Sequence, residues 1–182
     1  MFSLCGKDIF VFDDVINRND IASFYNMIEK LSFTRNEYDN KGEPYCIFST
    51  DLIPDKVESQ LQIGLMARRL INECFVEGAN YILYRSYLNM SHYGDMSYPH
   101  RDCHLNEQDI TILYYPNITW DRLWGGGTTF YEDGESRLLI TPKPGRFVVF
   151  PGNIEHKGEI PTRICNVSRF SFALKYKLVN QV

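Results

Sequence analysis

The spacing of apolar residues in this chain changes near position 80. Before that point, hydrophobic residues recur at helical spacing in two segments, about 18–31 and 55–77. After it, short runs rich in β-branched and aromatic residues alternate with turns that contain glycine or proline. The pattern therefore predicts two helices followed by a series of short strands.

The two predicted helices differ in length and in their end signals. The first has five apolar residues at helical spacing, Ile21, Phe24, Tyr25, Ile28 and Leu31. Asn17 or Asn19 is suited to cap its start, because a short amide side chain accepts hydrogen bonds from free backbone N–H groups. The second opens with Pro54-Asp55 and ends at Gly78, and its apolar face is broad, comprising Val57, Leu61, Leu65, 67–70, Ile71 and Phe75. Between the helices, Asn40-Lys41-Gly42 predicts a turn that joins two extended segments.

Strand composition recurs in the rest of the chain. Six segments share it: Tyr81–Met90, Ile110–Tyr115, Thr128–Tyr131, Leu138–Thr141, Arg146–Phe150 and Val167–Leu178. Helices followed by many short strands fit a mainly β fold, a double-sheet jelly roll with N-terminal helices packed on one sheet. No repeat or linker interrupts the sequence, so we expect one domain over 1–182, with helical support at about 1–79 and a β core at about 80–178.

The last predicted strand has two different faces. Alternation puts four large apolar residues on one face, Phe170, Phe172, Leu174 and Tyr176, and this face is predicted to enter the core. The other face carries Arg169, Ser171, Ala173 and Lys175. Small residues beside an arginine would leave space for a bound anion, but the same pattern also fits a solvent-exposed face.

The composition favours a packed domain without a nucleic-acid partner. The 182 residues are 44% hydrophobic and 14% aromatic, which is enough to bury a core. Lys plus Arg number 19 against 23 Asp plus Glu, so the net charge is −4. Because no basic stripe is present to attract a phosphate backbone, we expect no nucleic-acid partner.

The cysteines and the N-terminal segment indicate the cytoplasm. The five cysteines are scattered and form no C-x-x-C pair, which is typical of free thiols in a reducing compartment. Charged residues interrupt Met1–Val15, so this segment is predicted to be neither a signal peptide nor a membrane span. We expect no membrane partner.

The strongest chemical signal is His100-Arg101-Asp102, followed by His156 and Arg169. Two imidazoles and one carboxylate form the ligand set that binds non-haem Fe(II) on one face and leaves the other open. The two side chains of His-x-Asp on an extended segment point to the same side, and His156 follows a strand that can lie beside them. Arg169 suits a dicarboxylate co-substrate such as 2-oxoglutarate, because guanidinium donates paired hydrogen bonds to carboxylates.

Other ligand sets are less well supported. Zinc also binds two histidines and an aspartate, but a zinc hydrolase would need an acid/base carboxylate, and no H-E-x-x-H or similar motif supplies it. His92 and His104 are interpreted as surface or core residues. His104 alternates with His100 and Asp102, so it remains a competing ligand at this stage.

Several linked motifs make the chain resemble the Fe(II)/2-oxoglutarate-dependent dioxygenases, in particular their prolyl-4-hydroxylase-like branch. The similarity covers about residues 81–178. Its motifs are, in order, Tyr98-Pro-His100-Arg-Asp102, Ile110-Thr-Ile-Leu-Tyr-Tyr115-Pro-Asn117, Trp124-Gly-Gly-Gly-Thr128-Thr-Phe130-Tyr131, Thr141-Pro-Lys-Pro-Gly145-Arg-Phe-Val-Val-Phe150, His156 and Arg169. Motifs in a fixed order are more specific than any one of them.

This resemblance implies a double-stranded β-helix, the cupin-like form of the jelly roll. It implies Fe(II) held by His100, Asp102 and His156, with O₂ as oxidant and ascorbate as an optional reductant. It also implies that four residues bind 2-oxoglutarate: Arg169 at the C5 carboxylate, aided by Tyr115 and Thr128, and Tyr87 on the strand that enters the site. Tyr115, Tyr87 and Thr128 also fit purely structural roles.

The chain departs from the family pattern at two places. Gly127 stands where the family often has glutamate, which is expected to change only the local turn. Arg169 follows His156 by 13 positions, a longer gap than the family usually shows, so Arg163 competes as the carboxylate ligand. We favour Arg169 because it begins the alternating strand, whereas Arg163 lies beside Pro161 in a predicted loop.

The resemblance leads us to expect an oxygenase that hydroxylates an unactivated C–H bond and releases succinate and CO₂. Asp102 favours hydroxylation, because related halogenases lack this carboxylate. A small-molecule substrate, such as an amino acid or a biosynthetic intermediate, is favoured because no recognition domain is appended. A protein side chain is the alternative substrate, and a non-catalytic β-roll binding module is the alternative function. Four residues are candidates for the substrate-binding rim, Arg85, Asn89, Arg101 and Trp124.

Overall fold

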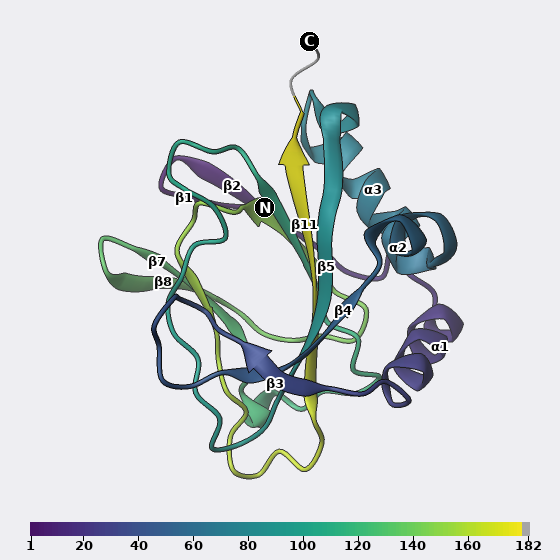
Figure 1. Ribbon diagram of the computed structural model, residues 1–182, viewed down its shortest axis with the longest axis vertical. Helices are drawn as coiled ribbons and strands as arrows, with labels where there is room; N and C mark the ends of the chain where they lie inside the picture. The colour runs from purple at the N-terminus through teal and green to yellow at the C-terminus, as the bar shows by residue number, and fades with distance from the viewer. Residues whose placement is uncertain (180–182) are drawn as a thin grey trace.

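The computed structural model describes residues 1–179 and has three layers (Figure 1). The large sheet has eight strands in the order β1 (Phe2–Leu4), β2 (Lys7–Phe12), β9 (Phe147–Pro151), β6 (Ile110–Tyr114), β11 (Arg169–Leu178), β5 (Tyr81–Ser91), β4 (Ile47–Leu52) and β3 (Thr34–Glu37). The small sheet has the order β10 (His156–Gly158), β7 (Thr128–Glu132) and β8 (Glu135–Ile140). Neighbouring strands in both sheets are antiparallel. The predicted mainly β, double-stranded β-helix fold is confirmed.

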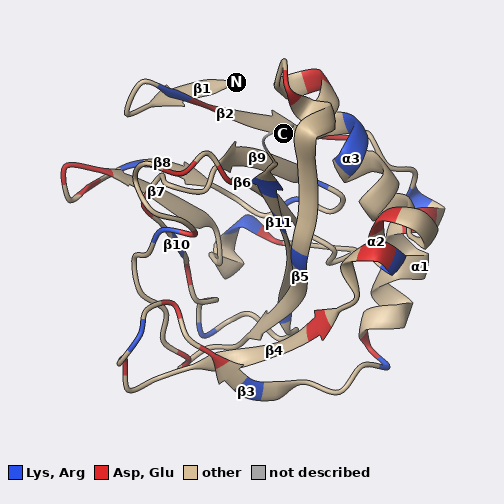
Figure 2. Cartoon of the chain, turned by 45° about the horizontal axis from the view of Figure 1, so that its top comes forward, with Lys and Arg blue, Asp and Glu red and all other residues tan. Residues whose placement is uncertain are grey.

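Helices cover the outer face of the large sheet. They are α1 (Arg18–Ile28), α2 (Pro54–Gln60) and α3 (Gln62–Cys74), with short 3₁₀ turns η1 (Gly78–Asn80) and η2 (Arg122–Trp124) elsewhere. Figure 2 shows the small sheet on the opposite side of the large sheet from the helices. The large sheet therefore lies between the helices and the small sheet. Within residues 1–179, no helix is long and apolar enough to span a bilayer.

The helix predictions need two corrections. The helix predicted at 18–31 ends at Ile28, and Asn17 is its cap, accepting a hydrogen bond from the Asp20 N–H. The helix predicted at 55–77 is two helices, separated at Leu61, which has extended backbone angles. The break brings Gly64 so close to the Val57 carbonyl that a Cβ at Gly64 would lie 2.0 Å from its oxygen. The apolar residues continue at helical spacing across Leu61, so the sequence pattern did not indicate a break there.

The strand predictions located the β core but left out β1, β2 and β10. Strands β1 and β2 extend the large sheet from the N-terminal segment, for which no strand was predicted. The two extended segments predicted around residues 40–42 become β3 and β4, which pair with each other. Strand β10 is only three residues long, which is too short to show a periodic pattern.

Two apolar clusters fill the spaces between the three layers. The larger one lies between the helices and the large sheet and includes Phe24 of α1, Leu70 of α3 and the apolar face of β11. The smaller one lies between the two sheets and includes Tyr115, Phe130 and Phe150. The apolar face of β11 is core, as predicted, since Phe172, Leu174 and Tyr176 have no exposed surface.

Loss of one aromatic ring from this core should destabilise the fold. Phe172 is fully buried, and its ring centre lies 5.3 Å from that of Phe24. We expect Phe172→Ala to lower the free energy of unfolding by about 3–5 kcal/mol, because it leaves a cavity between sheet and helix. Urea denaturation monitored by far-UV circular dichroism measures the change. Ile82→Ala, at an exposed position near the start of β5, is the control and should change stability by less than about 0.5 kcal/mol.

Candidate active site

A cavity of about 280 Å³ lies between the two sheets. The large sheet contributes alternate residues of β5 and β11, namely Arg85, Tyr87, Asn89, Ser91, Arg169, Ser171, Ala173 and Lys175. The small sheet contributes Thr128, His156 and Gly158. The second face of β11 therefore lines a cavity and is not solvent-exposed, because all four of its residues are at least nine-tenths buried.

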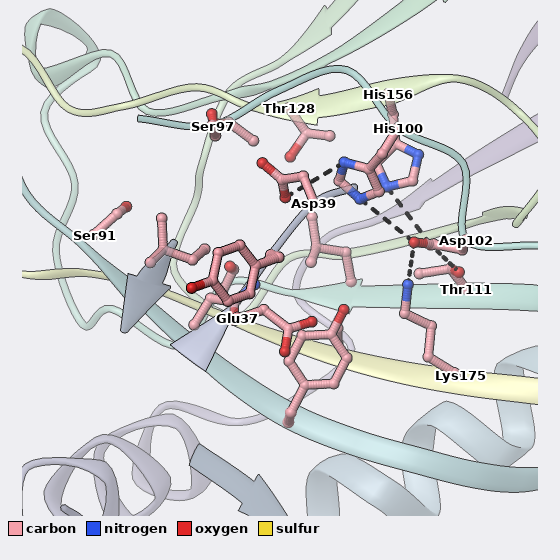
Figure 3. A pocket seen from close by; sticks show the side chains of 18 of the residues that line it. Glu37, Asp39, Ser91, Ser97, His100, Asp102, Thr111, Thr128, His156 and Lys175 are labelled. Atoms are coloured by element: carbon pink, nitrogen blue, oxygen red, sulfur yellow. Dashed lines mark hydrogen bonds and ion pairs between the residues drawn. The ribbon is translucent and has the colours of Figure 1, made fainter. Parts of the chain in front are cut away.

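Three predicted ligands meet at one end of this cavity (Figure 3). Ligand atoms of His100, Asp102 and His156 all lie within 4.8 Å of one another. His100 and His156 exchange two backbone hydrogen bonds of 2.9 Å, which fix the segment before β6 against β10. The Asp102 N–H donates to the Gly152 carbonyl at 2.7 Å. Residues far apart in sequence are thus held together by backbone contacts as well as by their side chains.

Both imidazoles present the same ring nitrogen to the site. His100 Nδ1 lies 3.0 Å from the Tyr98 carbonyl oxygen, and His156 Nδ1 lies 3.0 Å from the Ile154 carbonyl oxygen. A carbonyl oxygen only accepts, so each contact assigns the ring proton to Nδ1 and leaves a lone pair on Nε2. The Nε2 atoms face Asp102, at 3.5 Å for His100 and 3.6 Å for His156. This orientation is the one that metal-binding histidines require.

The site favours a neutral His156 and an ionised Asp102. Burial lowers the pKa of His156 to about 4, so its lone pair is free at neutral pH. Burial also opposes protonation of His100, but the hydrogen bond and charge of Asp102 outweigh it and raise the pKa of His100. Burial works against ionisation of Asp102, yet the positive charge of Lys175 holds the pKa of Asp102 well below the usual range.

Asp102 is satisfied on both carboxylate oxygens. Its Oδ1 forms an ion pair with the ammonium group of Lys175, from the cavity face of β11. Its Oδ2 accepts a 2.5 Å hydrogen bond from the Thr111 hydroxyl on β6. Lys175 and Asp102 are both buried, so this ion pair is shielded from water (Figure 3).

Arg169 lies along the same strand from Lys175 and is also buried. Its Nε donates to the Gly126 carbonyl at 2.5 Å, and one of its terminal nitrogens lies 3.2 Å from the Ser171 hydroxyl. A Cβ at Gly126 would lie 3.0 Å from Arg169 Cδ, so the small residue makes room for the guanidinium. Among residues 1–179, Arg169 forms no ion pair with an Asp or Glu side chain. Burial lowers its pKa, and the charges of Tyr115 and Glu159 only partly offset this.

Of the other predicted cofactor residues, Tyr115 and Thr128 lie near Arg169, whereas Tyr87 lies nearer Lys175. The Tyr115 hydroxyl lies 2.7 Å from the Thr128 hydroxyl, and the Arg169 guanidinium carbon lies 5.8 Å from the Tyr115 ring centre. Tyr87 lines the cavity nearer Lys175, whose ammonium group lies 5.7 Å from the Tyr87 ring centre. The competing Arg163 is exposed and lies outside the cavity lining.

The predicted rim residues divide into two groups. Arg85, Asn89 and Arg101 line the cavity, but Arg85 already makes two hydrogen bonds to Glu37, of 2.7 and 3.1 Å. Trp124 is not part of the lining and instead packs edge-to-face on Trp120, with ring centres 5.3 Å apart. His92 and His104 are both exposed, and neither belongs to the three-residue cluster.

The sequence analysis did not identify the side chains that contact His100 and Asp102. Lys175 was placed on the correct face by alternation, but nothing in the pattern indicated its ion pair with Asp102. Thr111 could have been found in the same way, since it lies two positions before Leu113, another cavity residue of β6. Asp39, whose carboxylate lies 3.4 Å from His100 Nδ1, comes from a turn with no distinguishing signal.

Comparison with known proteins agrees with this geometry. Residues 88–176 match the sequence model of the 2OG-Fe(II) oxygenase superfamily. The chain belongs to this superfamily. It is therefore a 2-oxoglutarate-dependent oxygenase that uses Fe(II) and O₂. A search of the curated proteins gives no sequence match.

Solved structures with the same fold include enzymes of different kinds. A prolyl hydroxylase of Trichoplax adhaerens, in complex with a hypoxia-inducible factor peptide, has a TM-score of 0.66 and 16% identity, covering 93% of this chain and 83% of that one. The Pseudomonas putida prolyl-4-hydroxylase has a TM-score of 0.66 and 17% identity, covering 94% and 92%. The epimerase SnoN from nogalamycin biosynthesis has a TM-score of 0.66 and 11% identity, covering 94% and 78%. At these identities the similarity shows the fold alone.

The residues of the oxygenase fit both groups that the superfamily uses. The Nε2 atoms of His100 and His156, together with an ionised carboxylate, form a donor set for Fe(II). At the other end of the cavity, the buried cation Arg169 lacks a carboxylate partner within the described part of the chain. The Ser91 hydroxyl, opposite Arg169 in the β5–β11 register, is buried and has no hydrogen-bond partner among residues 1–179. A dicarboxylate would supply acceptors to both groups.

The low pKa of His156 predicts that the metal-free enzyme loses stability in mild acid. His156 binds a proton below about pH 4 when folded, but below about 6.5 when unfolded, so the unfolded state gains protons first as the pH falls. Between pH 7 and 5 this costs about 2 kcal/mol. We expect His156→Phe, which keeps a ring against Phe130 and Phe150, to show a smaller loss of stability over that range. Urea titrations at both pH values, with a metal chelator present, measure the difference, and equal losses would contradict it.

Proposed function

We propose that this oxygenase hydroxylates an unactivated C–H bond of a small molecule and releases succinate and CO₂. In this proposal His100, Asp102 and His156 hold Fe(II), and Arg169 binds the C5 carboxylate of 2-oxoglutarate. The observation that carries the proposal is the placement of three ligands and a buried, anion-seeking arginine in one cavity. A structural metal site would not need that arginine.

The bound iron would supply the oxidation, together with 2-oxoglutarate and O₂. The side chains of the enzyme provide geometry and a dry environment. The carbonyl contacts of His100 and His156 keep both Nε2 atoms aimed at one point, and Thr111 fixes the Asp102 carboxylate. The apolar groups of Leu113, Phe150 and Ala173 line the same cavity.

Cavity size supports a small substrate. A space of about 280 Å³ that also receives 2-oxoglutarate leaves room for only a small group beside the metal ligands. Charged residues of both signs line the cavity, with Glu37 and Asp39 as acids and Arg85 and Arg101 as bases. These groups suit a polar compound such as an amino acid or a biosynthetic intermediate.

A protein side chain is the second candidate substrate, and one observation favours it. An open groove of about 850 Å³ adjoins the cavity and shares Tyr84, His100, Arg101 and Asp102 with it. A peptide lying in the groove would place one side chain near the metal ligands. The Trichoplax adhaerens enzyme of the same fold is in complex with a peptide.

We expect the enzyme to convert 2-oxoglutarate to succinate in an Fe(II)-dependent reaction. His100→Ala and Asp102→Ala should abolish both metal retention and succinate formation, because each removes a ligand of the three-residue set. Mass spectrometry of metabolite pools, and separately of peptide libraries, should find a product that has gained one oxygen atom. Metal binding by the wild type without turnover in any mixture would favour a binding module instead. Unchanged turnover in either variant would refute the proposed mechanism.

The two candidate arginines can be distinguished by their effect on co-substrate affinity. We expect Arg169→Met to raise the KM for 2-oxoglutarate by about a hundredfold or more, since it removes one partner of a buried charge pair. Arg163→Met should leave this KM unchanged, because Arg163 is exposed and outside the cavity. Succinate release as a function of 2-oxoglutarate concentration gives both values. The reverse result would assign the carboxylate to Arg163.

A further inference from the structure

Lys175 occupies an unusual place for a lysine. It is 7% exposed, lines the cavity and forms an ion pair with Asp102, one of the three proposed metal ligands. Its neighbour Tyr87 is uncharged at neutral pH, since burial raises the pKa of that hydroxyl group to about 12. The charge of Asp102 is thus the main compensation for the charge of Lys175.

A divalent cation and the ammonium group compete for this carboxylate. Any ion bound by Asp102 comes close to Lys175, because both contact the same side chain. Their repulsion is strong in a buried site, where little water screens it. The ion pair also stabilises the empty site, because a buried carboxylate without a partner is costly. Both effects make the empty site more favourable relative to the metal-loaded one.

We propose that Lys175 is a built-in counter-ion that occupies the metal site of the empty enzyme and lowers its affinity for divalent metal. This inference rests on the proposed ligand set. Lys175 acts through Asp102 and is therefore a positioning residue. Its consequence is that the enzyme folds with a neutralised site before metal arrives, and fills with metal only at a higher free concentration than the three ligands alone would require.

The test compares variants that remove the charge with variants that keep it. Lys175→Gln and Lys175→Met remove the ammonium group, whereas Lys175→Arg retains a positive charge. Lys177→Gln is the matched control, because Lys177 lies on the same strand but is exposed. The probe is Mn²⁺, whose dissociation constant is measured by calorimetry at one fixed pH, without 2-oxoglutarate or O₂ turnover.

We expect both neutral variants to bind Mn²⁺ about tenfold or more tightly than the wild type, since the competing charge is gone. Lys175→Arg and Lys177→Gln should stay within about threefold of the wild type, because both keep the buried charge. The metal-free neutral variants should melt at a lower temperature than the wild type, and saturating Mn²⁺ should remove most of this difference. Where a neutral variant folds only with metal, the dependence of its melting temperature on Mn²⁺ concentration gives the affinity.

Two results would overturn the inference. One is Mn²⁺ binding by the neutral variants that equals or is weaker than wild-type binding. The other is neutral variants that stay unfolded even in saturating Mn²⁺, since a loaded site without the competing charge should be at least as stable. A different result concerns the ligand set itself: if the wild type and His100→Ala bind Mn²⁺ equally, the proposed metal site fails whatever Lys175 does.

Discussion

The structure of the active site depends on the buried, ionised carboxylate of Asp102. A charge without solvent must have partners, and Asp102 has four: Lys175, Thr111 and the two ligand histidines. These partners come from β11, β6, β10 and the segment before β6. The carboxylate is therefore a point at which both sheets are tied together. Because these polar contacts converge on one side chain, the contacts that shape the site also hold the two sheets together.

Strand β11 makes this convergence possible by having two different faces. One face packs Phe172, Leu174 and Tyr176 beneath the helices, and the other carries two buried cations with small residues between them. A strand at the centre of a sheet covered on both sides would normally be apolar on both faces. The cost of burying Arg169 and Lys175 is offset where each finds a complementary group, Asp102 for Lys175 and, in our proposal, a carboxylate of 2-oxoglutarate for Arg169.

Much of the fold, and the grouping of His100, Asp102 and His156, could be predicted from local sequence. Alternation on β11 identified its core face but left its second face open between a binding face and a solvent face, and the order of motifs from His100 to Arg169 indicated the superfamily that the comparison then showed. The break at Leu61 could not be read from the sequence, because it depends on the close approach of Gly64 to Val57. The partner of Lys175 was also inaccessible, since strand pairing decides which residues face each other across a cavity. The contact of Trp124 with Trp120 could not be read from the sequence either, because a family motif identifies a turn without saying what its side chains contact.

The charges of the cavity also suggest why a divalent metal and a dicarboxylate suit each other here. The deep part of the cavity holds two cations, Lys175 and Arg169, and one anion, Asp102, while His156 is neutral. Fe(II) alone adds two positive charges to a site that is already positive, and 2-oxoglutarate alone adds two negative charges. Together they leave the total charge unchanged, so the pair adds no net charge for the buried side chains to compensate. The cavity therefore carries the same net charge when it is empty as when it holds both ligands.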